Sequence, residues 1–168
     1  MIKIVERISD GMGILAAWLF FAIGMMVTYE VVSRYVFLSP TIWAEEMSQF
    51  FQIWATYLAA AHVLKQNHLI RIEFLIDRVD GRTRRLLEAL TLIIIAVFAG
   101  VGFWYGLDIV RESIAQNRHT STMLGVPKWM TESAIPVGMG LLFLQAAAQA
   151  IRLIIDKNLD FTSTAHEI

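Results

Sequence analysis

The sequence has no cysteine and carries little charge. The absence of cysteine from all 168 residues excludes a disulfide, a thiolate nucleophile and a cysteine-ligated iron–sulfur cluster. Charged residues make up only 17% of the chain, and the formal net charge is −1. A nucleic-acid partner demands a basic surface, so we expect no binding to nucleic acid.

What the sequence does have is long apolar segments. Hydrophobic residues make up 57% of the chain, whereas soluble domains are typically about 45–50% apolar. A helix needs roughly 20 apolar residues to cross the hydrocarbon core of a bilayer. We predict an all-α membrane protein with one domain at residues 1–160 and spanning helices at about 12–38, 43–66, 84–111 and 128–156. The first segment is too long for a signal-peptide core and lacks a clear cleavage site, so we expect it to be retained.

The connections between these helices have signals of their own. Pro40 should end the first helix, and Thr41 is a candidate cap for the second. Between the second and third helices, apolar residues of 69–80 recur on one helical face, which predicts a short amphipathic helix at the membrane interface, stopped by Gly81. The polar residues 161–168 should form a loose tail.

The basic residues predict an orientation. Cytoplasmic loops are enriched in Lys and Arg. Of the 14 Lys and Arg residues, ten flank one side: Lys3, Arg7, Lys65, Arg71, Arg78, Arg82, Arg84, Arg85, Arg152 and Lys157. The other side has Arg34, Arg111, Arg118 and Lys128. Both termini and the middle loop are therefore predicted to be cytoplasmic.

One charged pair lies inside a predicted spanning segment. Glu30 and Arg34 are four residues apart, the spacing of an intrahelical ion pair. Charges within a membrane segment are by default functional or assembly features. Either the pair neutralises itself near the outer interface, with Arg34 reaching toward the head groups, or one member contacts another helix and fixes assembly.

Polar residues also recur at helical spacing in the second and fourth segments. The second segment carries Glu45, Gln49, Gln52 and Thr56 on one stripe. This stripe should face protein or water, because lipid would leave its amides and its carboxylate without partners. For the fourth segment, packing within the four-helix unit is an equal alternative; its face comprises Ala134, Gly138, Gln145, Gln149 and Arg152.

We find no arrangement of residues for catalysis. The sequence shows no Ser/His/Asp set, phosphate-binding glycine loop or metal-ligand spacing, so we expect neither an enzyme nor a cofactor. Membrane haem needs two facing axial ligands, and only His62 lies clearly inside a predicted helix. The sequence assigns no role to His62.

Several short motifs follow one another along the chain. They are EVVSRY at 30–35, WAEE at 43–46, Trp54, His62, IEF at 72–74 and LGVPKW at 124–129. In their order, their spacing and the four-helix plan, over residues 5–156, they resemble the small permease subunit, the DctQ-like component, of tripartite ATP-independent periplasmic (TRAP) transporters.

The resemblance implies a small scaffold subunit in the bacterial inner membrane. Such a subunit supports a large elevator-type permease subunit, which binds sodium and takes up an organic acid of the sialic acid or C4-dicarboxylate class. A periplasmic binding protein delivers that acid. The resemblance implies contacts with the large subunit or with lipid at Glu30, Arg34, Trp43, Glu45, Glu46, Gln49 and Gln52. It implies contacts with the binding protein at Ser39, Arg118 and Lys128, and no substrate site in this chain.

Two other functions stay open at this stage. One is a self-sufficient four-helix exporter that couples to protons through Glu30, although the neighbouring Arg34 opposes a titrating role. The other is a respiratory membrane anchor, which would hold haem. The sequence identifies neither the transported acid nor the oligomeric state, and it does not say whether the polar stripes meet a partner directly or through lipid.

Overall fold

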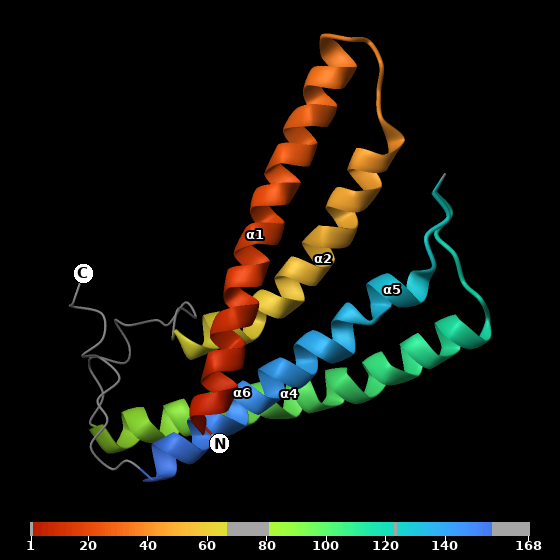
Figure 1. Ribbon diagram of the computed structural model, residues 1–168. Coiled ribbons are helices and arrows are strands. Elements are labelled where there is room, and N and C mark those ends of the chain that lie inside the picture. The colour runs from red at the N-terminus through yellow and green to blue at the C-terminus, as the bar shows by residue number, and fades with distance from the viewer. Residues whose placement is uncertain (1, 67–80, 123, 156–168) are drawn as a thin grey trace.

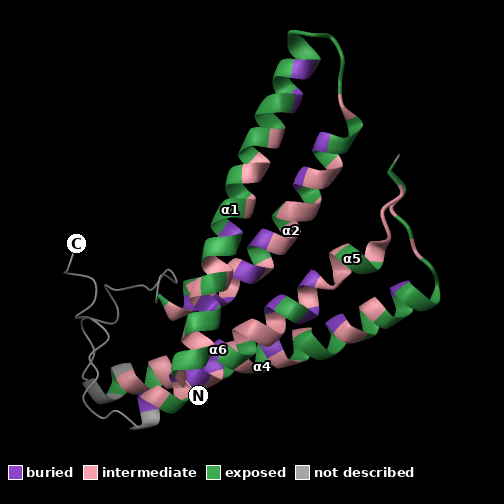
Figure 2. Cartoon of the chain, in the orientation of Figure 1, coloured by how far each residue is buried: buried purple, intermediate pink, exposed green. Residues whose placement is uncertain are grey.

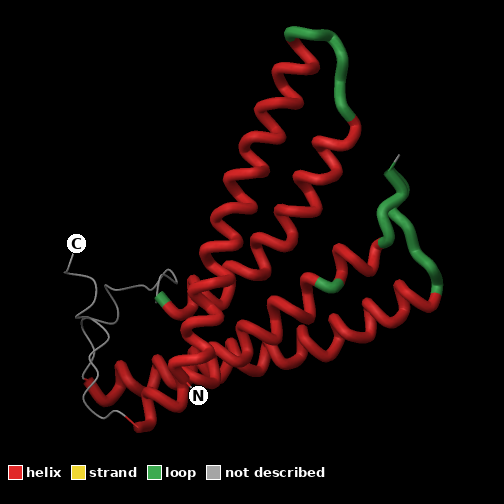
Figure 3. Tube along the Cα trace, in the orientation of Figure 1, coloured by secondary structure: helices red, strands yellow, loops and turns green. Residues whose placement is uncertain are grey.

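The computed structural model describes residues 2–66, 81–122 and 124–155. In these residues no strand forms (Figure 3). One isolated bridge pairs His119 with Pro127. The all-α prediction is therefore confirmed for the part of the chain that the structure describes. The helices are α1 (Ile2–Tyr35), α2 (Ile42–Lys65), α4 (Gly81–Ala115), α5 (Lys128–Glu132) and α6 (Ala134–Ile155).

The helices form two hairpins that meet at one end and diverge toward the other (Figure 1). One hairpin is α1 with α2, and the other is α4 with α5 and α6. The hairpins contact each other chiefly through α2 and α6. We call the end that carries residues 36–41 and 116–127 the loop end. The opposite end, where α1 begins and where α2 and α6 finish, is the network end.

Three of the described helical segments are long and apolar enough to cross a membrane. They are Ile2–Tyr35, Arg85–Ala115 and Lys128–Leu153. Helix α2 is not among them, although its 24 residues would extend about 36 Å as a helix. Its carboxylates, amides and basic residues lower its hydropathy. Length and composition alone therefore support three spans, and a fourth span through α2 needs a separate argument.

Two helices begin earlier than the sequence suggested. Helix α1 starts at Ile2, whereas we expected Met12. Its first turns are polar, but Glu6 and Ser9 bind other helices, so the helix continues as packed structure rather than ending at the apolar boundary. Gly81, expected to stop the preceding segment, instead opens α4. The predicted interfacial helix at 69–80 and the tail at 161–168 lie outside the described residues.

The predicted fourth helix is interrupted. Helix α5 ends at Glu132, and α6 begins at Ala134, with Ser133 between them. Pro136 explains the interruption, because proline has no N–H and its ring collides with the carbonyl four residues earlier, which belongs to Glu132. The Ser133 hydroxyl and the Trp54 indole N–H both donate to the Met130 carbonyl, at 2.9 and 3.1 Å. The break thus anchors α2 to the second hairpin.

Burial is confined to the seams between helices (Figure 2). Most of the buried apolar residues are alanines, including Ala16, Ala55 and Ala146. Small side chains let helix axes approach closely, which is how membrane helices pack. Most large apolar side chains instead point outward, including Trp18, Phe98 and Trp104. A surface of this kind suits lipid or a protein partner.

Candidate functional site

The first candidate feature is a polar latch at the loop end, formed by Glu30, Arg34 and Thr41. Arg34 donates to Glu30 Oε1 from Nη2 at 2.7 Å and from Nε at 3.1 Å. The Thr41 N–H donates to Glu30 Oε2 at 2.9 Å, and the Thr41 hydroxyl bonds to the same oxygen. The latch therefore closes the α1–α2 turn by joining the end of α1 to the start of α2.

The latch bears on two predictions from the sequence, for Thr41 and for Arg34. Thr41 does occupy the N-cap position of α2, but its hydroxyl makes no capping bond and binds Glu30 instead. Arg34 is paired within its own helix, as its spacing predicted, and its side chain is 49% exposed while that of Glu30 is 10% exposed. The carboxylate is therefore used within the chain, whereas the outer edge of the guanidinium is accessible.

Helix α2 presents an exposed polar stripe made of Glu45, Gln49, Gln52 and Thr56. The Thr56 hydroxyl donates to the Gln52 carbonyl at 2.8 Å. In the described part of the chain, the side chains of Glu45, Gln49 and Gln52 make no hydrogen bond. Trp43 extends this surface toward the loop end, where it packs against Tyr29 at a ring-centroid distance of 5.8 Å.

Glu46 differs from its neighbours on the stripe. Its Oε2 accepts a hydrogen bond from the Thr122 hydroxyl at 2.8 Å, and its Oε1 accepts one from the Leu124 N–H at 3.3 Å. Both donors belong to the connection between α4 and α5. Glu46, predicted to contact a partner or lipid, therefore joins the two hairpins of this chain at their loop end.

Of the three residues expected to meet a binding protein, Ser39 and Arg118 lie in the connections at the loop end, and Lys128 begins α5 directly after them. Ser39 is exposed in the α1–α2 turn. Arg118 and Lys128 are brought together, because the Lys128 N–H donates to the Arg118 carbonyl at 3.0 Å. The Arg118 side chain is held within its own loop, since Nε donates to Gln116 at 2.8 Å and Nη2 lies 3.4 Å from Glu112.

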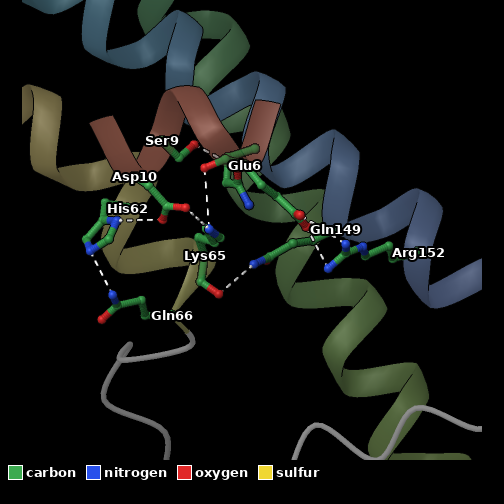
Figure 4. Close-up of polar contacts among 9 residues, drawn as sticks. Glu6, Ser9, Asp10, His62, Lys65, Gln66, Gln149 and Arg152 are labelled. Atoms are coloured by element: carbon green, nitrogen blue, oxygen red, sulfur yellow. Dashed lines mark hydrogen bonds and ion pairs between the residues drawn. The ribbon is translucent and has the colours of Figure 1, made fainter. Parts of the chain in front are cut away.

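The network end holds a polar cluster that the sequence did not reveal (Figure 4). Lys65 Nζ lies 2.5 Å from Asp10 Oδ2, which joins α2 to α1. His62 Nδ1 lies 3.4 Å from Asp10 Oδ1, and its Nε2 lies 2.8 Å from the Gln66 amide. His62 also packs against the backbone at Gly13, where a Cβ would collide with its ring. The unassigned histidine is thus a packing residue between α1 and α2.

The same cluster joins α6 to α1 and to α2. Arg152 contacts both carboxylate oxygens of Glu6: Nη2 donates to Oε2 at 3.0 Å, and Nη1 lies 2.6 Å from Oε1. Guanidinium–carboxylate pairs with two contacts are among the stronger ion pairs. Inside, the buried Ser9 hydroxyl donates to Gln145 Oε1 at 2.8 Å. The Gln149 amide donates to the Leu64 carbonyl at 2.9 Å, which satisfies an acceptor at the C-terminus of α2. We call these residues and the Asp10, Lys65 and His62 contacts the inner network.

These contacts show that the polar face predicted for the fourth helix packs against other helices of this chain. Ala134, Gly138, Gln145 and Gln149 are buried inside this chain, so packing within the unit accounts for them. Sequence reasoning missed Glu6, Asp10 and Lys65 because their partners are 55 or more residues away. The available signal was the spacing of Glu6 and Asp10, two acids four residues apart in a polar N-terminal segment that also carries Lys3 and Arg7.

Among the described residues, no group of three or more His, Cys, Asp or Glu side chains is placed to hold a metal ion. The polar groups of the chain instead bind one another, at the latch and in the inner network. The arrangement therefore offers structural contacts and an unsatisfied stripe on α2, rather than a set of side chains converging on a reacting atom.

Comparisons with known proteins agree with this arrangement. The family model described as "Tripartite ATP-independent periplasmic transporters, DctQ component" matches residues 23–156. The C4-dicarboxylate TRAP transporter small permease protein DctQ of Rhodobacter capsulatus is 31% identical over 109 residues, covering 63% of this chain and 48% of that protein. The protein of the same name from Vibrio cholerae is 25% identical over 177 residues, covering 91% and 75%.

A third relative is a longer protein. The isethionate TRAP transporter permease protein DctMQ of Oleidesulfovibrio alaskensis is 26% identical over 141 residues, which cover 80% of this chain and 21% of that protein. The chain thus spans about a fifth, a half and three quarters of the three relatives it matches. All three are transporter components and not enzymes. Because the family model covers most of its length, this chain belongs to the DctQ component family of the tripartite ATP-independent periplasmic transporters.

Proposed function

We propose that this chain is the small membrane scaffold subunit of a TRAP transporter and supports a large permease subunit in the uptake of an organic acid. The observation that carries the proposal is the exposed stripe of Glu45, Gln49 and Gln52 on α2. Polar side chains in a lipid environment without hydrogen-bond partners are costly. A second membrane protein that covers the stripe would remove this cost.

A large permease is the partner that best fits the stripe. The name of the Oleidesulfovibrio relative, DctMQ, contains the letters of two components, M and Q. The match to this chain covers only 21% of that protein. That relation supports a larger component working beside the DctQ part. We infer that Gln49 and Gln52 bind this permease, directly or through an interfacial lipid, and that Arg34 and Trp43 lie at the edge of the same contact.

The transport reaction itself belongs to the partners in this proposal. The large subunit would bind sodium and carry the substrate, and a periplasmic protein would deliver the substrate near Ser39, Arg118 and Lys128. The names of the relatives, isethionate and C4-dicarboxylate, support a small organic anion as the substrate. Sialic acid, the other class suggested by the resemblance, stays within this proposal.

The proposal includes four spans in the bacterial inner membrane with both termini in the cytoplasm. The start of α1 and the ends of α2 and α6 meet in the inner network. If α1 crosses the membrane, α2 must return across it for Lys65 to reach Asp10. The basic residues around the network end support its placement in the cytoplasm.

The rival function, a proton-coupled exporter that uses Glu30, is disfavoured by the latch. Both carboxylate oxygens of Glu30 already accept hydrogen bonds, from Arg34 and Thr41. A proton carrier must instead release and bind its proton at a site open to a pathway. Glu30 is occupied in holding the α1–α2 turn.

Gentle purification of the tagged chain from its native membrane tests the proposal. We expect a multi-helix permease to co-purify in a fixed ratio, and deletion of the chain to abolish organic-acid uptake while the permease is still inserted. A homodimer that alone moves cations in vesicles would overturn the scaffold function and favour the exporter.

A further inference from the structure

The turn between α1 and α2 carries a bare apolar tip, formed by Val36, Phe37 and Leu38. Their relative exposures are 69%, 71% and 83%. The tip belongs to the turn at the loop end (Figure 1), and Thr41 of the latch follows it by three residues. Three adjacent apolar side chains without cover on a turn are unusual for a surface that faces water, and they mark a contact site.

The turn that carries the tip has a defined conformation. Leu38 has a φ angle of +54°, which non-glycine residues seldom adopt. Two hydrogen bonds close the turn below it: the Ser39 N–H donates to the Ser33 carbonyl, and the Ser33 hydroxyl donates to the Ser39 carbonyl, each at 3.0 Å. The latch fixes the next residues through Thr41. A conformation held by its surroundings in this way is typical of functional loops.

Lipid tails are a poor cover for this tip. Counted from Asp10 in the inner network, about 20 helical residues cross a hydrocarbon core of about 30 Å, which brings the outer boundary close to Glu30. The tip follows Glu30 by six to eight residues.

The other turn at the same end of the molecule provides the contrast. Residues 116–122 there are all polar, and Arg118 and Glu112 are paired. Its backbone is also bonded, since the Thr120 N–H donates to the Val126 carbonyl at 2.9 Å. That turn has the composition of a surface in water. The α1–α2 turn, which closes the neighbouring hairpin at this end, has the composition of a buried contact.

The tip is continuous with the proposed partner surface of α2. Ile42 and Trp43 follow it in the chain and are exposed, and the stripe of Glu45, Gln49 and Gln52 begins one turn later. We propose that Val36, Phe37 and Leu38 insert into an apolar recess at the outer edge of the large permease, above the membrane contact made by the α2 stripe. This inference rests on the proposed function and adds a second, extramembrane contact to it.

Site-specific photocrosslinking in the intact complex tests the inference. A photoreactive phenylalanine analogue replaces Phe37 in one variant and Leu124, an exposed apolar residue of the other turn, in the control. We expect the Phe37 position to crosslink to the large permease and the Leu124 position to give little of that product. A Phe37 adduct only with lipid, or only with the periplasmic binding protein, would overturn the inference.

Substitution provides a second, independent readout. The double variant Phe37→Ser with Leu38→Ser should reduce the recovery of permease by about ten-fold or more, as expected when apolar anchors are lost from an interface. Leu124→Ser should leave recovery unchanged. If the unmodified chain brings down no permease at all, the proposed function fails. If it does, and the double variant recovers permease normally, only the apolar tip is refuted.

Discussion

At the scale of single residues, Glu30 is the acceptor on which the α1–α2 turn depends. It accepts from Arg34, from the Thr41 N–H and from the Thr41 hydroxyl. Glu30→Ala would leave the Thr41 N–H at the start of α2 without its acceptor, so the turn should open more often. We expect faster hydrogen exchange in residues 36–44, measured by mass spectrometry in detergent.

The control for this variant is Glu112→Ala, which removes an exposed carboxylate bonded to Gln116 and Arg118 in the other turn. It should leave exchange in residues 36–44 unchanged. Equal exchange in Glu30→Ala and in the unmodified chain would contradict the latch.

A second prediction at this scale concerns Asp10 and Lys65. Their ion pair joins α1 to α2 at 2.5 Å. Asp10 also contacts His62, and Lys65 also donates to the backbone carbonyl of Glu6. A double-mutant cycle with Asp10→Asn and Lys65→Gln should give a coupling free energy of about 1 kcal/mol, at the upper end for partly exposed pairs. The measurement is thermal unfolding of the chain in detergent.

The matched pair for this cycle is Asp108 with Arg111, which are 3.5 Å apart and exposed on α4. Its coupling should be below about 0.5 kcal/mol. Coupling of the same size in both cycles would mean that the inner network contributes no more than an ordinary surface pair.

Single residues also show where sequence reasoning reached its limit. The Glu30–Arg34 pair was predictable because both partners lie on one helix at a fixed spacing. Thr41, the third member of the latch, was not, because its contact depends on the path of the turn. The resemblance assigned Glu46 to a contact with the large subunit or lipid, but its acceptor oxygens bind a loop 76 and 78 residues away. Long-range pairing of this kind leaves no local pattern.

At the scale of elements, the seam between α2 and α6 decides how the hairpins join. A Cβ built on Gly138 would lie 2.5 Å from the Tyr57 Cβ and 2.7 Å from the Tyr57 carbonyl oxygen. Backbone atoms cannot move aside as a flexible side chain can. Gly138→Ala should therefore push the two helices apart and lower the midpoint of thermal unfolding by several degrees, equivalent to about 1–3 kcal/mol.

The control at this scale is Gly24→Ala on α1, where a Cβ would meet nothing within 4 Å. Alanine has the higher helix propensity, by about 1 kcal/mol, so this variant should be neutral or slightly stabilising. If the two variants had equal effects, the close approach of α2 and α6 would not contribute to stability.

The elements themselves were predictable to different degrees. Apolar length located α4 and most of α1, because hydropathy reports directly on helices that meet lipid. The break at Ser133 was not foreseen, although Pro136 carried its signal, because a proline in the first turns of a helix does not by itself say where the preceding helix ends. The start of α1 was placed too late because its polar residues were not known to have partners.

At the scale of the whole molecule, we expect the α2 stripe to contribute to assembly with the permease and not to the folding of this chain. Gln49→Leu with Gln52→Leu removes two amides that have no hydrogen bonds in the described chain. The isolated protein should keep its unfolding midpoint, whereas recovery of the large permease should fall by about ten-fold, as for the loss of central interface residues. Thr28→Leu, at an exposed position on α1, is the control and should leave recovery unchanged. Loss of the folded chain itself would instead assign the amides to internal stability.

The proposed four-span topology rests on how the ends of the described helices meet. The inner network brings the start of α1, the end of α2 and the end of α6 to one end of the molecule. If α1 crosses the membrane, α2 must therefore cross it too, despite its lower hydropathy.

Because the chain has no cysteine, single cysteines give labelling without background. With an impermeant maleimide on spheroplasts, Ser39→Cys and Ser121→Cys should be labelled at once, and Ile4→Cys only after the membrane is opened. Labelling of Ser39 and Ser121 from opposite sides would exclude a transmembrane arrangement of both hairpins, and immediate labelling of Ile4 alone would reverse the orientation that the basic residues predict.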